Sequence, residues 1–138
     1  MYGRQPVPLV PDTPERTERQ RSARGEALAQ LSNAVVAHIK DFTGRGPDRV
    51  RSYWGNDDDA VFVVLRGGRT EMEKSLHAVG AGDSGSGRRA LMTALEPLLI
   101  ETAERATGRR VSSVIIGSSR DQDVSAITFL LEPRSRLS

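Results

Sequence analysis

The chain has 138 residues, no cysteine and two histidines, with 20 Lys and Arg against 18 Asp and Glu. This length supports one hydrophobic core, and the lack of cysteine excludes disulfides and thiolate zinc sites. The sequence contains no run of about 18 apolar residues that could span a bilayer, and its first residues lack the apolar segment of a secretory signal. We therefore expect a one-domain protein of the cytoplasm.

The isoelectric point of about 9.5 comes mostly from the N-terminal region. Residues 1–25 hold five arginines against three acidic residues, which leaves 15 basic and 15 acidic groups for the remainder. Phosphate binding needs a net basic face, so a neutral remainder weakens the case for a nucleic-acid-binding protein.

Two regions of different character form the first third of the chain. Four prolines and alternating charges in residues 1–21 are typical of a disordered tail, because few apolar groups are available to offset the entropy of folding. From about Ser22 to Thr43, one helical stripe of apolar residues follows, after which Gly44 suits a helix cap. The stripe consists of Leu28, Leu31, Val35, Ile39 and Phe42.

Two β-hairpins are predicted. "VRSYW" and "AVFVVLR" flank the turn-forming "GNDDD", and "RVSSVIIG" and "VSAITFLLE" flank "SSRDQD". The run "AVFVVLR", residues 60–66, is apolar at both alternating sets of positions, which predicts a central strand buried on both faces.

Helices are predicted between the hairpins. Thr70 and Glu73 fit a capping box that begins a short helix, and a longer apolar stripe runs from Leu91 to about Thr107. Pro97 lies inside the longer stripe and should kink or divide that helix. The fold class predicted is α+β, in the order helix, β-hairpin, helices, β-hairpin, with a four-stranded antiparallel sheet packed on helices. One domain would span 22–133, followed by a C-terminal tail at 134–138.

A short sequence echo marks both transitions from helix to hairpin. Thr43 to Arg45 reads "TGR" and precedes Arg49-Val50, and "TGR" recurs at 107–109, directly before Arg110-Val111. The shared tripeptide suits a glycine C-cap with a cation near the negative end of the helix dipole. The insertion Gly46-Pro47-Asp48 is peculiar to the first instance.

The stretch "TGRGPDR" has the glycines of a phosphate-binding loop but the wrong order of elements. In a phosphate loop a helix follows the glycines and its amides hold the anion, whereas here a helix precedes the loop. We therefore interpret it as a partner- or ligand-binding surface rather than a phosphate site. Its candidate residues are Arg45, Gly46, Pro47, Asp48 and Arg49.

Other motifs carry weaker predictions. Gly80, Gly82 and Gly85 match G-x-G-x-x-G without the strand that a dinucleotide site needs before it, which leaves a weak anion site at Arg88 and Arg89. The acidic triplet 57–59 lacks the spaced ligands of a calcium loop and is predicted to be a solvated turn. The histidines pair with no nucleophile in a known motif, and Tyr53 and Trp54 are expected to pack in a core or an interface. We predict no catalytic residue, metal or cofactor.

Three stretches together resemble the bacterial MpsC-domain family of the Na⁺-translocating membrane potential-generating system. They are "GRGP" with the hydrophobic strand and "E.K.L" segment after it, the "TG..V.SV" junction, and the closing "ITFLLE". The resemblance covers roughly residues 25–132, and it departs from the family pattern at "GAGDSGSG" and at Gly117-Ser118. It implies a small α+β protein without a known catalytic residue, linked from the cytoplasmic side to a membrane system for inorganic-carbon or ion uptake.

The function predicted from these observations is that of a non-enzymatic cytoplasmic accessory or regulatory protein, peripheral to the inner face of the membrane. Its expected partners are a membrane transporter or membrane potential-generating complex and a second copy of itself, because a four-stranded sheet leaves exposed edges. Two alternatives stay open. One is a nucleic-acid-binding module using the arginine-rich tail and the first hairpin, and the other is an anion-sensing domain.

Overall fold

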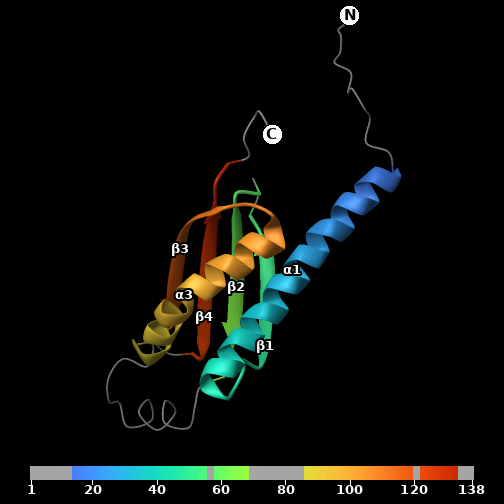
Figure 1. Cartoon of the computed structure of the whole chain (residues 1–138). Coiled ribbons are helices and arrows are strands. Elements are labelled where there is room, and N and C mark those ends of the chain that lie inside the picture. The colour runs from blue at the N-terminus through green and yellow to red at the C-terminus, as the bar shows by residue number, and fades with distance from the viewer. Residues whose placement is uncertain (1–13, 56–57, 69–85, 120–121, 134–138) are drawn as a thin grey trace, which may run out of the picture.

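The computed structural model describes residues 14–55, 58–68, 86–119 and 122–133 (Figure 1). The predicted α+β class and its four strands are confirmed. The short helix predicted at Thr70, the loop at 80–85 and the tails 1–13 and 134–138 lie outside these residues. The elements in chain order are α1 (Pro14–Thr43), β1 (Arg49–Trp54), β2 (Ala60–Arg66), α3 (Ser86–Thr107), β3 (Val111–Ser118) and β4 (Val124–Leu131).

The four strands form one antiparallel sheet in the order β1-β2-β4-β3. Each hairpin therefore contributes one central and one edge strand, and pairing of β2 with β4 joins the hairpins. Helices α1 and α3 lie across the same face of this sheet, as Figure 1 shows. The opposite face is not covered by any element in the described part of the chain, and we call it the open sheet face.

The hydrophobic core fills the space between the helices and the sheet. Each contributing element presents apolar residues at its own period, every third or fourth residue in a helix and every second in a strand. Burying one such side chain contributes about 1.5–3 kcal/mol. The core residues are Leu31, Val35, Ile39, Met92, Leu95, Leu99, Ala103, Val61, Val63, Leu65, Ile127, Phe129 and Leu131.

The first helix is longer than its apolar stripe. It begins at Pro14 instead of Ser22, so the prediction of a disordered tail is wrong for residues 14–21. Proline is well accepted at the first helical position, and glutamate, glutamine and arginine are good helix formers. Since the buried turns already nucleate the helix, each further turn adds hydrogen bonds without a new nucleation cost.

Pro97 does not divide the second long helix. Helix α3 continues from Ser86 to Thr107 with Pro97 inside it. Leu95 and Leu99 on either side are buried in the core, and their packing holds both turns against the sheet. We attribute the continuity of the helix to this packing, which offsets the hydrogen bond that proline removes.

Strand β2 is central, as predicted, but only one of its faces is buried. Val61, Val63 and Leu65 face the helices and are fully covered, whereas Phe62 is 38% exposed on the open sheet face. The prediction of burial on both faces is therefore wrong. An apolar run shows that a strand tolerates burial on both sides, but here the helices supply cover for one side only.

Candidate functional site

Helix α1 ends in a capped turn at Thr43-Gly44-Arg45. The Thr43 hydroxyl Oγ1 donates to the carbonyl of Ile39 at 2.8 Å, and the Arg45 amide donates back to that hydroxyl at 3.1 Å. Gly44 has a φ of 83°, and its amide donates to the carbonyl of Lys40 at 2.7 Å. Glycine takes this left-handed conformation without a steric penalty, which confirms the predicted cap.

Helix α3 ends in the same way at Thr107-Gly108-Arg109. Thr107 Oγ1 donates to the carbonyl of Ala103 at 2.7 Å, and the Arg109 amide donates to Thr107 Oγ1 at 3.2 Å. Gly108 has a φ of 72°, and its amide donates to the carbonyl of Glu104 at 2.8 Å. The repeated tripeptide is thus a structural cap at both junctions.

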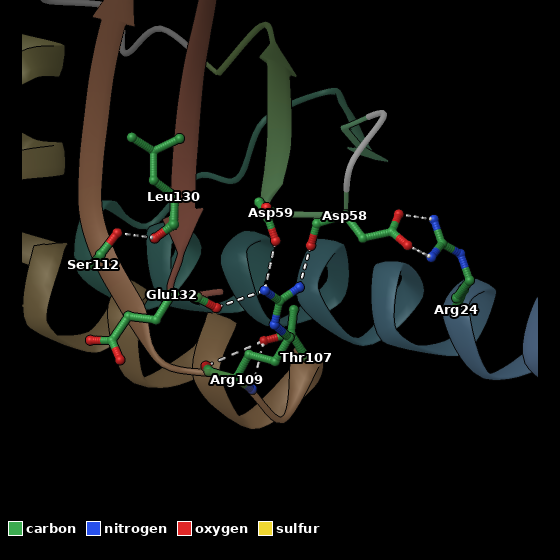
Figure 2. A network of polar contacts seen from close by, with 8 residues as sticks. All are labelled: Arg24, Asp58, Asp59, Thr107, Arg109, Ser112, Leu130 and Glu132. Atoms are coloured by element: carbon green, nitrogen blue, oxygen red, sulfur yellow. Dashed lines mark hydrogen bonds and ion pairs between the residues drawn. The ribbon is translucent and has the colours of Figure 1, made fainter. Parts of the chain in front are cut away.

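The arginine of the second junction is a structural clamp, shown in Figure 2. Its side chain is only 8% exposed and reaches the turn between β1 and β2 and the end of β4. The guanidinium donates to the carbonyl of Asp58, to Asp59 Oδ1 at 2.9 Å and to the carbonyl of Glu132 at 2.7 Å. Arg109 therefore ties three separate segments together.

The acidic turn that Arg109 holds is also held from α1. Arg24 pairs with the Asp58 carboxylate at 2.6 Å, and the hydrogen bond that Arg24 donates to Asp58 raises the pKa of Arg24 (Figure 2). The Arg24 guanidinium also lies 4.9 Å from the ring centroid of Trp54, a cation–π contact. Trp54 packs against the core as predicted. Asp58 and Asp59 are thus engaged in protein contacts, and Asp57 lies outside the described residues.

The arginine of the first junction has a different environment. Arg45 is exposed, and no hydrogen bond or ion pair of its side chain occurs within the part of the chain that the structure describes. Phe42, one residue before the cap, is 61% exposed, and the corresponding position at the second junction is the half-buried Ala106. The C-terminal end of α1 thus presents an aromatic ring and a cation to solvent. We call Phe42 and Arg45 the first-junction surface.

The inserted residues between α1 and β1 have an architectural role. The Asp48 amide donates to the carbonyl of Arg66 at 2.8 Å, which places the insertion against the end of β2. Gly67 and Gly68 follow β2 with φ values of 79° and 90°, and a Cβ on Gly68 would lie 3.0 Å from Pro47 Cα. Three residues of the predicted site at 45–49, Gly46, Pro47 and Asp48, therefore pack against Gly67 and Gly68 and have a structural role.

Arg49 belongs to another surface than Arg45. It alternates along β1 with Val50, which packs against the core, and so Arg49 lies on the open sheet face. Arg51 and Arg66 lie on the same face, and all three arginines are exposed. None forms an ion pair within the described ranges. Arg66 was not among the residues predicted from the sequence, although its alternation with Leu65 is a signal that could have placed it on this face.

A hollow of about 550 Å³ lies between α1 and α3. His38 Nε2 and Thr102 Oγ1 are 3.0 Å apart at its wall, and Asp41 and Arg105 line it as well. Arg105 is already paired with Glu101 at 2.8 Å. Ala34, Ala37 and Ala106 complete the lining, and the carboxylate of Asp41 together with the neutralised Arg105 does not favour an anion as the ligand. The sequence did not indicate this hollow, because its two walls are 64 residues apart at the His38–Thr102 contact.

Three predicted positions lie outside the described side chains. Arg88 and Arg89 fall in the first turn of α3, but their side chains lie outside what the structure describes, as does His77.

Among the described residues, no group of three His, Asp or Glu side chains is placed to hold a metal ion. No helix in the described ranges has both the length and the apolar character needed to cross a bilayer.

Comparison with known proteins gives one family. The model of the family described as "Na+-translocating membrane potential-generating system (MpsC)" matches residues 23–133, which is most of the chain. The match includes both Thr-Gly-Arg junctions, the four described strands, all of α3 and the part of α1 from residue 23 onward. Neither the curated proteins nor the solved structures contain a match.

Proposed function

Since the chain belongs to the MpsC family, we propose that it is a non-enzymatic accessory or regulatory protein of a membrane potential-generating system, acting from the cytoplasmic side. Family membership associates it with such a system. The proposed task is to bind a subunit of that membrane complex, one that serves inorganic-carbon or ion uptake. In this proposal the protein is peripheral to the inner face of the membrane.

The observation that supports a binding role is the first-junction surface. Aromatic residues and arginine are enriched among the residues that dominate binding energy at protein interfaces. Phe42 is among the most exposed large apolar side chains of the described chain, and Arg45 has no intramolecular partner there. We therefore propose that the membrane partner contacts Phe42 and Arg45.

The rigidity of this surface also supports the proposal. Arg45 follows a helix cap with three hydrogen bonds, and the insertion behind it is packed on Gly67 and Gly68. A binding surface on a fixed backbone loses less conformational entropy when the complex forms. We propose that Gly46, Pro47 and Asp48 support the surface instead of contacting the partner. Arg49 is assigned to the open sheet face.

The test is capture of the partner from detergent-solubilised membranes of the native organism by the full-length tagged protein. We expect subunits of a membrane transporter or oxidoreductase to be enriched, and the double variant Phe42→Ala/Arg45→Ala to lose them. Arg110→Ala is the matched control, because Arg110 is exposed and immediately follows the second junction. It should capture the partner as the wild type does.

Two results would count against the proposal. Capture without any membrane protein would remove the accessory role. Equal capture by the wild type and by Phe42→Ala/Arg45→Ala would leave the role intact and exclude the first-junction surface as the contact.

We also propose that the protein acts as a homodimer. The two sheet edges, β1 and β3, carry unpaired backbone groups, which is the basis of the prediction from sequence. The open sheet face offers a second and larger surface for self-association.

A further inference from the structure

The open sheet face carries positive charge and no negative charge. Side chains alternate along each strand, so every second residue lies on this face. None of the four described strands contains an acidic residue, and the charged residues on the face are Arg49, Arg51 and Arg66. Since residues 26–138 hold equal numbers of basic and acidic groups, the face is more basic than that region as a whole.

The three arginines form one cluster at the open end of the first hairpin. Arg49 and Arg66 are cross-strand partners, and Arg51 lies two residues further along β1, about 7 Å away. Like charges directly opposite one another destabilise a strand pair. The Asp48 carboxylate lies against Gly67, and no ion pair joins it or any other described acidic residue to the cluster. An anion from outside would relieve the repulsion, and a phosphate group fits the planar fork of a guanidinium.

An apolar row crosses all four strands beside the arginine cluster. Tyr53 on β1 is opposite Phe62 on β2, Phe62 is opposite Thr128 on β4, and Thr128 is opposite Ile115 on β3. Tyr53 is 48% exposed, Phe62 38% and Ile115 57%. The half-buried Val64 lies between the aromatic pair and the arginines. Adjacent exposed apolar groups mark an interaction surface more often than scattered ones do.

The acidic residues at the other end of the hairpin do not extend the charge pattern of the face. Asp58 and Asp59 pair with Arg24 on α1 and with Arg109 after α3, which lie on the helix side of the sheet (Figure 2). Glu132, the residue after β4, lies across from the arginine that precedes β3, so their charges offset. The face therefore has a basic end and an apolar centre, without an acidic region.

We propose that the open sheet face binds the surface of a bilayer that contains anionic phospholipids. The arginine cluster contacts headgroup phosphates, and the apolar row lies among the glycerol groups and the first carbons of the acyl chains. A tyrosine ring suits this depth, and arginine side chains extend along apolar surface to keep their charges among the headgroups. The inference rests on the proposed peripheral location and names the surface that provides it.

The apolar half of the face distinguishes a bilayer from a nucleic acid. A single-stranded nucleic acid would use Tyr53 and Phe62 for stacking and the arginines for phosphates. Ile115, the most exposed residue of the row, would have no role there, because an aliphatic side chain neither stacks on a base nor binds a phosphate. A bilayer offers phosphates and hydrocarbon side by side across its surface, and so it matches both halves of the face.

A second copy of the chain fits the face less well. It would bring further arginines and apolar groups but no acidic residue from its described strands, so both clusters would stay without counter-charges. The sheet edges β1 and β3 remain available for the proposed homodimer. The first-junction surface belongs to the end of α1 in the helix layer, which leaves it available to the protein partner (Figure 1).

The experiment is flotation of the full-length protein with vesicles of phosphatidylcholine, either alone or with about 30% phosphatidylglycerol, which gives a negative surface potential. The wild type should bind the anionic vesicles at least about tenfold more tightly than phosphatidylcholine alone. Its affinity should fall as salt is raised from about 50 to 500 mM, because salt screens the surface potential. Binding that does not depend on phosphatidylglycerol, or no binding to either vesicle, would overturn the proposal.

The variant Arg49→Gln/Arg51→Gln/Arg66→Gln tests the arginine cluster. Each arginine near an anionic surface raises the affinity about fivefold, so the triple variant should bind about 100-fold more weakly. Glutamine at these exposed positions also removes the repulsion between the cross-strand pair. The variant should therefore unfold at no lower urea concentration than the wild type.

The charge-matched control is Arg19→Gln/Arg21→Gln/Arg110→Gln. These three arginines are exposed and lie outside the open sheet face. The control should bind anionic vesicles within about threefold of the wild type, because charges away from the contact are screened by salt. Equal losses in the two triple variants would show an effect of net charge alone and would overturn the assigned face.

A fluorescent label tests the apolar contact. The chain contains no cysteine, so Ile115→Cys gives a single site for an environment-sensitive fluorophore. Its emission should shift to shorter wavelength on anionic vesicles, because the apolar row enters the interface. Asn33→Cys, at an exposed position on α1, is the matched control and should show no shift. An unshifted emission from Ile115→Cys while the protein is bound would overturn the orientation.

A labelled single-stranded oligonucleotide tests the other polyanion. If it binds more tightly than the anionic vesicles and loses its affinity in Arg49→Gln/Arg51→Gln/Arg66→Gln, the face binds nucleic acid and the lipid assignment is overturned. Oligonucleotide binding that is weaker than vesicle binding supports the bilayer.

Vesicle binding and partner capture separate this inference from the accessory role. The vesicles contain no protein, and a detergent extract contains no bilayer. Phe42→Ala/Arg45→Ala should lose the partner and keep vesicle binding, whereas the arginine-cluster variant should do the reverse. A wild type that captures its partner but does not bind anionic vesicles would overturn the bilayer contact alone.

Discussion

At the end of α1, Thr43 and Gly44 make the same capping hydrogen bonds that Thr107 and Gly108 make at the end of α3. The arginines that follow have opposite environments. Arg109 is buried and bonded to three segments, while Arg45 is exposed without a partner in the described chain. The comparison shows that the cap depends on the threonine and the glycine, whereas the environment of the arginine depends on the surrounding structure.

The difference follows from the residues on either side of the cap. At the second junction the chain passes from Arg109 through Arg110 directly into β3, and the acidic turn of the first hairpin lies within reach of its guanidinium. At the first junction, Gly46, Pro47 and Asp48 intervene and pack on the end of β2. The insertion thus fixes the backbone while leaving Arg45 and Phe42 exposed.

The largest expected difference between the junctions concerns their arginines. Arg109→Ala removes a buried cation and leaves the carbonyls of Asp58 and Glu132 without their donor, which should lower the free energy of unfolding by about 2–4 kcal/mol. Arg45→Ala should change it by less than about 0.5 kcal/mol, as for most exposed positions. Urea denaturation of both variants measures the two values. Similar losses in the two would contradict the assigned roles.

The second prediction concerns the support behind the first junction. Gly68→Ala forces a side chain into a left-handed backbone and to 3.0 Å from Pro47 Cα. We expect a loss of about 2–3 kcal/mol in the free energy of unfolding. Gly117→Ala, where a Cβ meets no atom within 4 Å, is the control and should be nearly neutral. If Gly68→Ala is tolerated equally well, the insertion is not held as described.

The smallest expected effect is the one that the junctions share. Gly44→Ala and Gly108→Ala each place a side chain at a positive φ with no atom within 4 Å of the new Cβ. Each should cost about 1 kcal/mol in the free energy of unfolding, because only the backbone conformation is penalised. Thermal or urea denaturation should give equal losses within error. A clearly larger loss at one junction would show that the two caps are not equivalent.

The sequence predicted the features that depend on neighbouring residues. Apolar spacing in α1 and alternation in β2 follow from local geometry, so the helices, strands and glycine caps could be located. The start of α1 at Pro14 was missed, because residues 14–21 have no apolar stripe and are helical through propensity and extension of an existing helix.

The functional surfaces depended on contacts between distant residues. The tripeptide "TGR" is the same at both junctions, so nothing in it distinguishes a buried Arg109 from an exposed Arg45. The distinction requires Asp59 and Glu132, which lie 50 and 23 residues away from Arg109 in the sequence. The open face of β2 was missed for a related reason, since an apolar run does not specify which of its faces the helices cover.

Affinity of the purified protein for the membrane subunit that it captures tests the central claim most directly. We expect Phe42→Ala/Arg45→Ala to raise the dissociation constant at least about 30-fold, the loss typical of removing a dominant contact. Arg110→Ala should bind as the wild type does, and all three proteins should unfold at similar urea concentrations. Unchanged affinity in Phe42→Ala/Arg45→Ala would contradict the assignment of the first junction to partner binding.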